Sequence, residues 1–323
     1  MIEIGIMGGS GYTAGELIRL LIHHPKVVLR SVLSTSQTGK PFYTVHQDLF
    51  GETDMRFTDT FDKGLDVVFL CLGHGMAKQA LENISQRVKV IDLSQDFRLA
   101  AQATFGGRTF IYGLPEQQRD RIKSAEAIAN PGCFATAIQL ALLPLARAKV
   151  LKSDIHISAI TGSTGAGRGL SDSTHFSWRD NNASTYKVFT HQHLHEIRES
   201  LDRWQKFFRQ EIYFVPYRGN FPRGIIATVY TNSHFSLKEN KELYHDYYVS
   251  HPFVQLSDEA VHLKQVVGIN KCVLHLAEQK GKLIITSVID NLLKGASGQA
   301  VQNLNLMYAW EESCGLRLKP IGF

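Results

Sequence analysis

A glycine-rich turn near the amino terminus constrains the fold of this chain more than any other feature. Residues 3–7 form a short apolar run, and Gly8-Gly9-Ser10-Gly11 follows it directly. Residues 14–22 then place apolar side chains at helical spacing. A strand, a glycine turn and a helix in this order begin a βαβ unit, in which the amides at the helix start can hold a pyrophosphate. The turn therefore predicts a doubly wound, dinucleotide-binding domain at the start of the chain.

The rest of the chain indicates two domains of different construction. Its 323 residues suffice for about two domains of ordinary size. In the first part, apolar strands alternate with a helical stretch, as in a parallel sheet with crossover helices, at 27–33, 67–72, 76–84, 88–93 and 127–129. Beyond it come an apolar helix, longer alternating strands and a polar helix, at 133–148, 155–160, 212–215, 225–230, 237–248, 272–278 and 283–289, before a closing helix at 299–312. We therefore expect an α/β fold with a doubly wound Rossmann domain and an α+β domain built on a mixed sheet.

The composition excludes several functional classes. With 44% apolar and 20% charged residues the chain is typical of soluble globular proteins, and no apolar run reaches the roughly 18 residues of a membrane helix. The amino terminus lacks the basic region of a signal peptide, so we expect a cytoplasmic protein. The net charge of +5 includes no basic run interleaved with aromatic residues, which argues against nucleic acid and favours small anionic ligands.

The glycine turn carries a dinucleotide-binding pattern. Residues 9–14 read Gly-Ser-Gly-Tyr-Thr-Ala and satisfy G-x-G-x-x-G/A. The acidic residue that binds the ribose 2′-hydroxyl of NAD is absent, since residues 17–47 contain neither Asp nor Glu. Hydroxyl and cationic side chains stand there instead and favour the 2′-phosphate of NADP; they are Arg30, Ser34, Thr35, Ser36 and Lys40. The competing interpretations are a tight turn without a ligand and a solvated polar loop.

Cys133 is the candidate nucleophile. It follows Asn130-Pro131-Gly132 at the expected start of the apolar helix, where unpaired amides and the helix dipole favour the thiolate, the nucleophilic form of cysteine. The other cysteines, Cys71, Cys272 and Cys314, lie in or beside apolar segments, and we expect them to be packing residues. No two cysteines have the spacing of a zinc site or a disulfide framework.

Three histidines offer the proton-transfer group that a cysteine nucleophile needs. Residues 190–196 read Thr-His-Gln-His-Leu-His-Glu. If the segment is extended, His191, His193 and His195 share one face; if it is helical, only His191 and His195 lie close together. Either arrangement can supply an acid or base near neutral pH. A metal site is the weaker alternative, because no Cys or carboxylate cluster with ligand spacing lies nearby, and we predict none.

Further motifs extend over nearly the whole chain. In order, they are GGSGYT at 8–13, VIDLSQDFRL at 90–99, YGLPE at 112–116, ANPGC at 129–133, GSTGAGR at 162–168, RGI at 223–225 and DNLLKGASGQA at 290–300. With these motifs the sequence resembles the N-acetyl-gamma-glutamyl-phosphate reductases of arginine biosynthesis, relatives of aspartate-semialdehyde dehydrogenase. Two segments depart from the family pattern. His191 and His193 match the histidines of its Gly-His-Arg-His motif with changed neighbours, and residues 215–222 stand where the family has a proline-histidine segment.

The resemblance implies an enzyme that reduces an acyl phosphate to an aldehyde with NADPH. Cys133 matches the catalytic cysteine, and we favour His193 over His191 as its acid and base. The family fold, of the glyceraldehyde-3-phosphate dehydrogenase type, implies a dinucleotide-binding domain of residues 1–131 and 297–323, and a catalytic and oligomerisation domain of residues 132–296. The relatives also imply a homodimer or homotetramer. The expected cofactor contacts are Gly8, Gly9, Ser10, Gly11, Tyr12, Thr13, Ser34, Thr35, Ser36, Ser163, Gly165, Asn291 and Gln299.

Three residues are candidates for binding the substrate. Arg98 is a candidate for the phosphate, because a guanidinium can bind phosphoryl oxygens with two parallel bonds; its alternative is an ion pair with Asp92 or Asp96. Arg223 is a candidate for the α-carboxylate, and Asn130 borders the nucleophile. We expect the amides at the start of the Cys133 helix to stabilise the oxyanion.

Alternative functions remain open at this stage. The same chemistry is compatible with N-succinyl-gamma-glutamyl phosphate, with aspartyl phosphate, or with a carrier-linked aminoadipyl phosphate. A different class is a non-catalytic sensor that binds NADP and has kept the fold.

Overall fold

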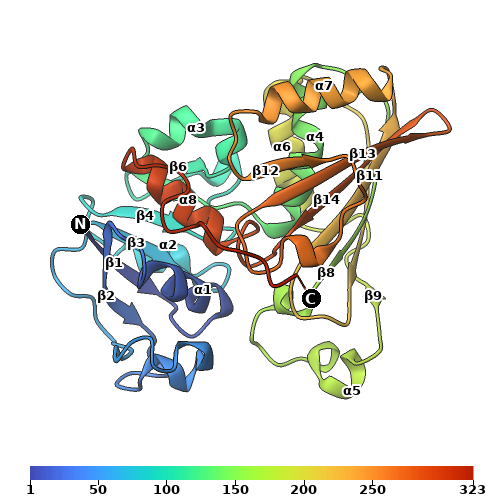
Figure 1. The fold of residues 1–323 in the computed structure, drawn as a ribbon. Helices are drawn as coiled ribbons and strands as arrows, with labels where there is room; N and C mark the ends of the chain where they lie inside the picture. Colours follow the sequence, from blue (N-terminus) through green and yellow to red (C-terminus); the bar gives the residue numbers. More distant parts are fainter. Residues whose placement is uncertain (323) are drawn as a thin grey trace. The chain divides into compact units, whose positions relative to one another are not determined.

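The computed structural model describes residues 1–322, which divide into two compact units (Figure 1). Unit 1 consists of Met1–Pro131 and Ala296–Arg317, and unit 2 of Gly132–Gly295 and residues 318–322. The last residues therefore group with unit 2, whereas we expected 297–323 in the first domain; Phe323 lies outside the described residues. Within residues 1–322, no helix is long and apolar enough to cross a membrane.

The sheet of unit 1 is parallel apart from one pair at its end. The strand order is β2-β1-β3-β4-β7-β6-β5, and only β5 and β6 pair antiparallel. All four residues of β3 are buried, as its unbroken apolar sequence indicates. Because β2 and β3 pair with opposite sides of β1, the chain order reverses at β1, where doubly wound sheets bind their ligands. The strands are β1 (Ile2–Met7), β2 (Val27–Leu33), β3 (Val67–Leu70), β4 (Lys89–Asp92), β5 (Thr104–Phe105), β6 (Arg108–Tyr112) and β7 (Ala127–Ala129).

Four helices cover this sheet, and one of them comes from the far end of the chain. They are α1 (Tyr12–Leu21), α2 (Ala77–Leu81), α3 (Pro115–Lys123) and α8 (Ser297–Met307). Every residue of α8 is buried, and the helix packs against α1 and α3 (Figure 1). Hydrogen bonds anchor it, since Ser297 Oγ donates to the Thr13 carbonyl at 2.8 Å and Asn303 Nδ2 to the Gly113 carbonyl at 2.9 Å. The closing helix is therefore joined to the segment that follows the glycine turn.

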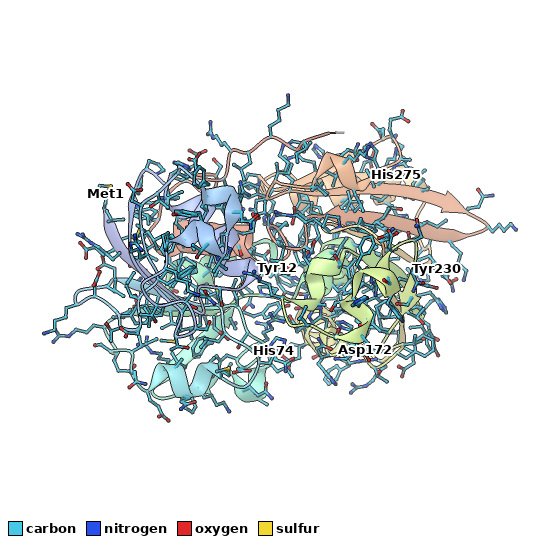
Figure 2. All side chains as sticks on the ribbon, turned by 90° about the horizontal axis from the view of Figure 1, so that it is seen from below. Met1, Tyr12, His74, Asp172, Tyr230 and His275 are labelled. Atoms are coloured by element: carbon cyan, nitrogen blue, oxygen red, sulfur yellow. The ribbon has the colours of Figure 1, made fainter. Side chains whose placement is uncertain are left out.

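Unit 2 is built on a mixed sheet with the order β12-β13-β14-β11-β8-β10-β9. The pairs β8–β10 and β12–β13 are parallel and the others antiparallel, which confirms the expected mixed sheet. Burial alternates along β8, β10, β11 and β13, so one face of the sheet is covered and the other is more open. On the open face, Tyr230 is 39% exposed (Figure 2). The strands are β8 (Ile155–Thr161), β9 (Ser184–Thr185), β10 (Ile212–Arg218), β11 (Ile225–Asn232), β12 (Val254–Ser257), β13 (Cys272–Gln279) and β14 (Lys282–Ile289).

The covered face of this sheet carries the main helices of unit 2. They are α4 (Cys133–Arg147), α6 (His193–Trp204) and α7 (Leu237–Tyr248), with a single-turn α5 (Phe176–Arg179) in the segment before β9. Helix α4 is central because it contacts α6, α7 and the strands β11, β13 and β14. From Phe134 to Ala146 all of its residues are buried, and the Tyr248 hydroxyl donates to its Leu140 carbonyl at 2.5 Å. This packing fixes the position of the amino end of α4.

Several elements differ from those expected from sequence. Helix α8 begins at Ser297 and ends at Met307, earlier than the expected 299–312, and Ala309 just beyond it has a φ of 52°, which a helix cannot accommodate. Helix α3 was not predicted because it is polar: of its nine residues, only Ile122 is a large aliphatic one. Helix α6 was also missed as an element; no capping side chain marks its start at His193.

Candidate active site

The glycine turn joins β1 to α1, and its glycines are required for different reasons. Gly8 has a φ of 88°, and a Cβ there would lie 2.4 Å from the Cys71 carbonyl oxygen. A Cβ at Gly9 would lie 2.4 Å from Cγ1 of Val32 on the neighbouring strand. Gly11, the N-cap of α1, has a φ of −78° and no atom closer than 3.7 Å to a built Cβ. The backbone thus approaches its surroundings closely at Gly8 and Gly9 and remains open at Gly11, where the helix amides begin.

A histidine that the sequence analysis missed holds this turn. His46 is buried, and its Nε2 donates to the Gly9 carbonyl oxygen at 2.7 Å. A Cβ at Gly15 would lie 2.5 Å from Nδ1 of the same ring, so this mid-helix glycine makes room for the imidazole. His46 is far in sequence from both Gly9 and Gly15, and no local pattern predicts these contacts.

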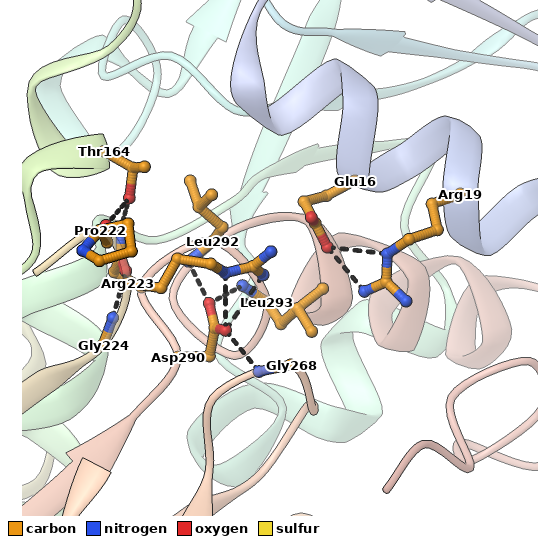
Figure 3. Close-up of polar contacts among 11 residues, drawn as sticks. Glu16, Arg19, Thr164, Pro222, Arg223, Gly224, Gly268, Asp290, Leu292 and Leu293 are labelled. Atoms are coloured by element: carbon orange, nitrogen blue, oxygen red, sulfur yellow. Dashed lines mark hydrogen bonds and ion pairs between the residues drawn. The ribbon is translucent and has the colours of Figure 1, made fainter. Parts of the chain in front are cut away.

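The segment after β2 bears the side chains expected to favour a 2′-phosphate. Thr35 and Ser36 are exposed, whereas Ser34 is buried. Arg30 is paired with Glu3 at 2.5 Å, which removes it from this group. The nearest acid before the segment, Glu16, is paired with Arg19 at 2.7 Å (Figure 3). The remaining expected contact, Tyr12, is the first residue of α1 and is 38% exposed (Figure 2), with Thr13 next to it.

Cys133 is the first residue of α4, as the sequence predicted. Gly132 is the N-cap of the helix, and Cys133 is partly exposed while the rest of the first turn is buried. A Cβ at Gly295 would lie 2.8 Å from the Cβ of Cys133, so a glycine is needed beside it. The other cysteines differ, since Cys272 is buried and loss of hydration raises the pKa of Cys71 to about 12.

A histidine and a glutamate lie against the start of α4. Glu196 is buried, and its Oε2 accepts the Gly132 N–H at 2.9 Å. Its Oε1 is 3.9 Å from Nε2 of His193, one helical turn away. A Cβ at Gly132 would lie 2.3 Å from His193 Nε2, which places this imidazole against the residue that precedes Cys133. The glutamate was not among the expected site residues, although its i,i+3 spacing from His193 is typical of a helical pair.

The three histidines do not form the arrangement expected from either regular structure. His191 precedes α6 in a turn, and its Nδ1 accepts the backbone N–H of His193 at 3.2 Å. The two rings are 4.6 Å apart, while His195 is exposed on the helix. The pair forms because the chain changes from turn to helix between its members, and both the extended and the fully helical expectation were wrong.

The environment keeps His191 neutral. Burial, with smaller contributions from the neighbouring His193 and Lys187, lowers its pKa to about 3. Tyr186 packs edge-on against His191 at 5.7 Å. Burial, with a smaller contribution from the nearby Cys133, raises the pKa of Tyr186 to about 12. Neither group changes protonation near neutral pH, which leaves His193 as the candidate acid and base beside the cysteine.

Arg98 and Asn130 form hydrogen bonds within unit 1. Arg98 is buried, and it donates from Nε to the Asn130 carbonyl at 2.9 Å and from Nη2 to the Leu93 carbonyl at 3.0 Å. Asn130 donates from Nδ2 to the Ala296 carbonyl at 3.0 Å and accepts from Asn303 at 3.1 Å. Burial and these bonds favour a positioning role for both residues over the expected direct contact with substrate.

Arg223 is held by a buried carboxylate (Figure 3). Its Nε and Nη2 each lie 3.0 Å from Oδ2 of Asp290, which is fully buried and also accepts the N–H groups of Gly268 and Leu292 at 2.7 and 2.8 Å. The Arg223 side chain is 23% exposed, so the guanidinium is fixed in orientation and still accessible.

The four remaining residues expected to contact the cofactor, Ser163, Gly165, Asn291 and Gln299, differ in burial and in hydrogen bonding. Asn291 ties two loops of unit 2 together, since it accepts the Gly224 N–H at 2.7 Å and donates to Thr164 Oγ1 at 3.0 Å. Both ends of its amide are thus engaged, which argues against the expected contact with the nicotinamide carboxamide. Ser163 is partly buried and Gly165 exposed in the neighbouring turn, and Gln299 is fully buried in α8. In the described part of the chain, no cluster of three His, Cys, Asp or Glu side chains forms a metal site.

Comparison with known proteins identifies the family. Residues 3–125 match the model of the semialdehyde dehydrogenase NAD binding domain, and residues 133–291 match that of the semialdehyde dehydrogenase dimerisation domain. A relative from Christiangramia forsetii named N-acetyl-gamma-glutamyl-phosphate reductase is 57% identical over 99% of both chains. Relatives of the same name from Karelsulcia muelleri and Bacteroides fragilis are 53% and 52% identical over the full length of both chains. The chain belongs to the N-acetyl-gamma-glutamyl-phosphate reductase family.

Solved structures agree with the fold of this reductase family member. Aspartate semialdehyde dehydrogenase II from Vibrio cholerae is 16% identical, with a TM-score of 0.72 over 96% of this chain and 98% of that one. Aspartate semialdehyde dehydrogenase from Candida albicans is 12% identical, with the same TM-score over 96% and 99%. These comparisons confirm the resemblance, the two-domain α/β fold and the assignment to the oxidoreductases. They support a nicotinamide cofactor and a dimerisation domain.

Proposed function

We propose that this protein reduces N-acetyl-gamma-glutamyl phosphate to N-acetylglutamate semialdehyde and phosphate with NADPH, as a step of arginine biosynthesis. The observation that carries the proposal is the arrangement at the start of α4, where Cys133 is partly exposed and His193 and Glu196 lie against Gly132. A thiol, an imidazole and a buried carboxylate in this order are the parts of an activated cysteine nucleophile.

In the first half of the reaction, Cys133 attacks the acyl carbon. His193 takes the thiol proton, and the Glu196 carboxylate at 3.9 Å stabilises the resulting imidazolium. The sulfur–carbon bond forms, the bond from carbon to the phosphate oxygen breaks, and phosphate leaves from the thioester. His191 remains neutral and orients the turn through its bond to the His193 amide.

In the second half, the thioester carbonyl is reduced. A nicotinamide cofactor, when bound, supplies the hydride. His193 donates its proton to the thiohemiacetal oxygen and takes it back as the carbon–sulfur bond breaks, which releases the semialdehyde and the thiolate. The Gly132 N–H is held by Glu196, so oxyanion stabilisation falls to the later amides in the first turn of α4.

The residues present fit a dinucleotide. Close backbone approach at Gly8 and Gly9, with the open amino end of α1 beside them, forms the cradle that a pyrophosphate requires. For NADP over NAD, the support is the absence of an acid in residues 17–47 and the exposure of Thr35 and Ser36. A Thr35→Asp variant is expected to raise the KM for NADP about tenfold by repelling the 2′-phosphate, and equal KM values in variant and parent would contradict this contact.

For the substrate, Arg223 is the proposed ligand of the α-carboxylate, because Asp290 fixes its guanidinium while part of it stays exposed. Arg98 and Asn130 position the segment before Cys133, and Ser163 and Gly165 lie in the loop proposed to adjoin the nicotinamide. We further propose a cytoplasmic homodimer or homotetramer that assembles through the sheet of unit 2.

The test is steady-state kinetics in the oxidising direction, with semialdehyde, phosphate and NADP or NAD. We expect the largest kcat/KM with N-acetylglutamate semialdehyde and NADP. A higher kcat/KM with the N-succinyl or aspartate compound would show that this compound is the substrate, and the proposed cysteine chemistry would still hold. NADP binding without turnover of any of these aldehydes would favour a sensor and overturn the enzyme.

A further inference from the structure

Arg218 is a cation near the proposed catalytic histidines that the mechanism above does not use. It is the last residue of β10, and it pairs with Ser184 of β9. Its guanidinium lies over the ring of Tyr186, 4.6 Å from the centroid. Tyr186 in turn packs against His191, whose ring contacts that of His193. A continuous series of ring contacts therefore connects Arg218 to the residues beside Cys133.

No carboxylate neutralises this guanidinium within the described residues. Arg218 has no ion pair, and its Nε is buried without a hydrogen-bond partner. Arg223, a few residues further on, differs because Asp290 binds it. A buried cationic N–H without an acceptor destabilises the folded protein, because the group has lost its hydration and gained no partner. Such a group is expected where a ligand supplies the acceptor.

A second guanidinium increases the positive charge at this place. Arg179 is buried, and its Nη1 donates to the Arg218 carbonyl at 2.8 Å, while Nε and Nη2 donate to the Ser173 carbonyl at 3.3 and 3.0 Å. Burial, and then repulsion from the like charge of Arg218, lower the pKa of Arg179. Arg179 has its donors engaged by backbone and thus acts as a support.

The other charges that face this cluster leave it cationic. Lys187 adjoins Tyr186 and donates to Gln192 at 2.9 Å. The carboxylate that faces His191 is Glu196, and it is bound to the Gly132 N–H. Asp180, next to Arg179, is exposed and accepts from Asn220 at 3.3 Å. The cations Arg218, Arg179 and Lys187 thus outnumber the two carboxylates, both of which already accept hydrogen bonds, and the surroundings favour an anion.

We propose that Arg218 binds an anionic oxygen group of the substrate, a carboxylate or a phosphoryl group, near Cys133, with Arg179 as its positioning residue. This inference rests on the proposed function. The planar guanidinium, fixed against Tyr186, presents N–H groups that suit two-oxygen anions. The site adds a ligand to Arg223 and lies in the segment 215–222, which departs from the family pattern.

The test compares Arg218→Gln, Arg218→Lys and the control Arg209→Gln, whose arginine is exposed elsewhere in unit 2. Kinetics are measured in the oxidising direction with phosphate and with N-acetyl or N-succinyl semialdehyde. We expect Arg218→Gln to raise one KM by about 10- to 100-fold, Arg218→Lys to raise it less, and the control to match the parent. If the KM for phosphate rises, Arg218 binds the phosphoryl group. If the KM for both aldehydes rises, it binds the α-carboxylate. If only the KM for the N-succinyl compound rises, it binds the carboxylate of the acyl group.

A second readout needs no turnover. Iodoacetamide is expected to alkylate Cys133, which is partly exposed, and inorganic phosphate or semialdehyde is expected to slow alkylation in the parent and less so in Arg218→Gln. Unchanged KM values and unchanged protection in a folded Arg218→Gln variant overturn the proposed site. If the parent turns over no aldehyde, the proposed function has failed, and this result is distinguishable because protection of Cys133 by the anion is still measured.

Discussion

The glycine turn of unit 1 and the cysteine site of unit 2 are built in opposite ways. The turn consists of consecutive residues, Gly8 to Tyr12, between one strand and one helix. The cysteine site draws on residues near 132, 191, 196 and 295, which approach one another through the packing of α4 against α6 and of the segment after β14 against Cys133. A local motif depends on backbone conformation, whereas an assembled site depends on side chains held by burial. Substitutions should therefore separate the two functions, cofactor binding and nucleophilic chemistry.

The largest effect is expected for a variant that lacks the nucleophile and retains the glycine turn. Cys133→Ala should lower kcat by about 10⁴-fold or more, because no thioester can form. NADPH affinity, measured by fluorescence titration, should stay within about threefold of the parent, since Cys133 and the turn lie in different units. Undiminished reductase activity in this variant would remove the mechanism.

The next largest effect is expected for a variant that disrupts the glycine turn and retains Cys133. Gly8→Ala puts a Cβ 2.4 Å from a carbonyl oxygen at a φ of 88°, which should cost about 2–4 kcal/mol and weaken NADPH binding about 100-fold. Gly11→Ala is the matched control, because its Cβ meets nothing closer than 3.7 Å. Thermal unfolding and NADPH titration of both variants give the answer. Equal behaviour of the two would show that conformation at Gly8 does not govern the turn.

A smaller effect concerns the carboxylate beside His193. Glu196→Gln keeps the size of the side chain and an acceptor for the Gly132 N–H but removes the charge 3.9 Å from the imidazole. We expect kcat to fall about tenfold and the acidic limb of the pH–rate profile to move to lower pH, because the imidazolium loses its stabilising partner. Glu242→Gln, on the exposed side of α7, is the control. An unshifted profile with a tenfold loss would assign Glu196 a purely structural role.

The last expected effect concerns stability rather than activity. The pKa of His191 is about 3 in the folded protein against its ordinary 6.5, so the unfolded chain takes up a proton first as the pH falls. The contribution of neutral His191 is thus complete above pH 6.5 and decreases below it, by about 1.4 kcal/mol per pH unit until about pH 3. Urea unfolding of His191→Gln should show a correspondingly flatter pH dependence, and that of the exposed His195→Gln should match the parent. A parent-like slope in His191→Gln would contradict this burial effect.

Short-range patterns predicted most of the fold. The strands β1 to β4 and β7 of unit 1, the apolar helix that begins at Cys133 and the helix Leu237–Tyr248 follow from periodicity, because each buries one face or is buried throughout, whereas β5 and β6 were not predicted. The prediction failed for the polar α3, where periodicity is weak, and for α6, whose start at His193 is marked by no capping side chain. The histidine pair shows why: its geometry depends on where a turn becomes a helix, and neither regular spacing describes that point.

The sequence by itself determined the order of the elements, the glycine turn and the place of Cys133 at a helix start, because backbone conformation and helix ends follow from neighbouring residues. The tertiary structure decided which side chains surround that cysteine. It brought His193 and Glu196 to Gly132, engaged Arg98 and Asn291 with internal partners, and left Arg218 without a carboxylate. Such contacts join residues tens to more than a hundred positions apart. Burial and charge balance select them, and these are properties of the packed molecule.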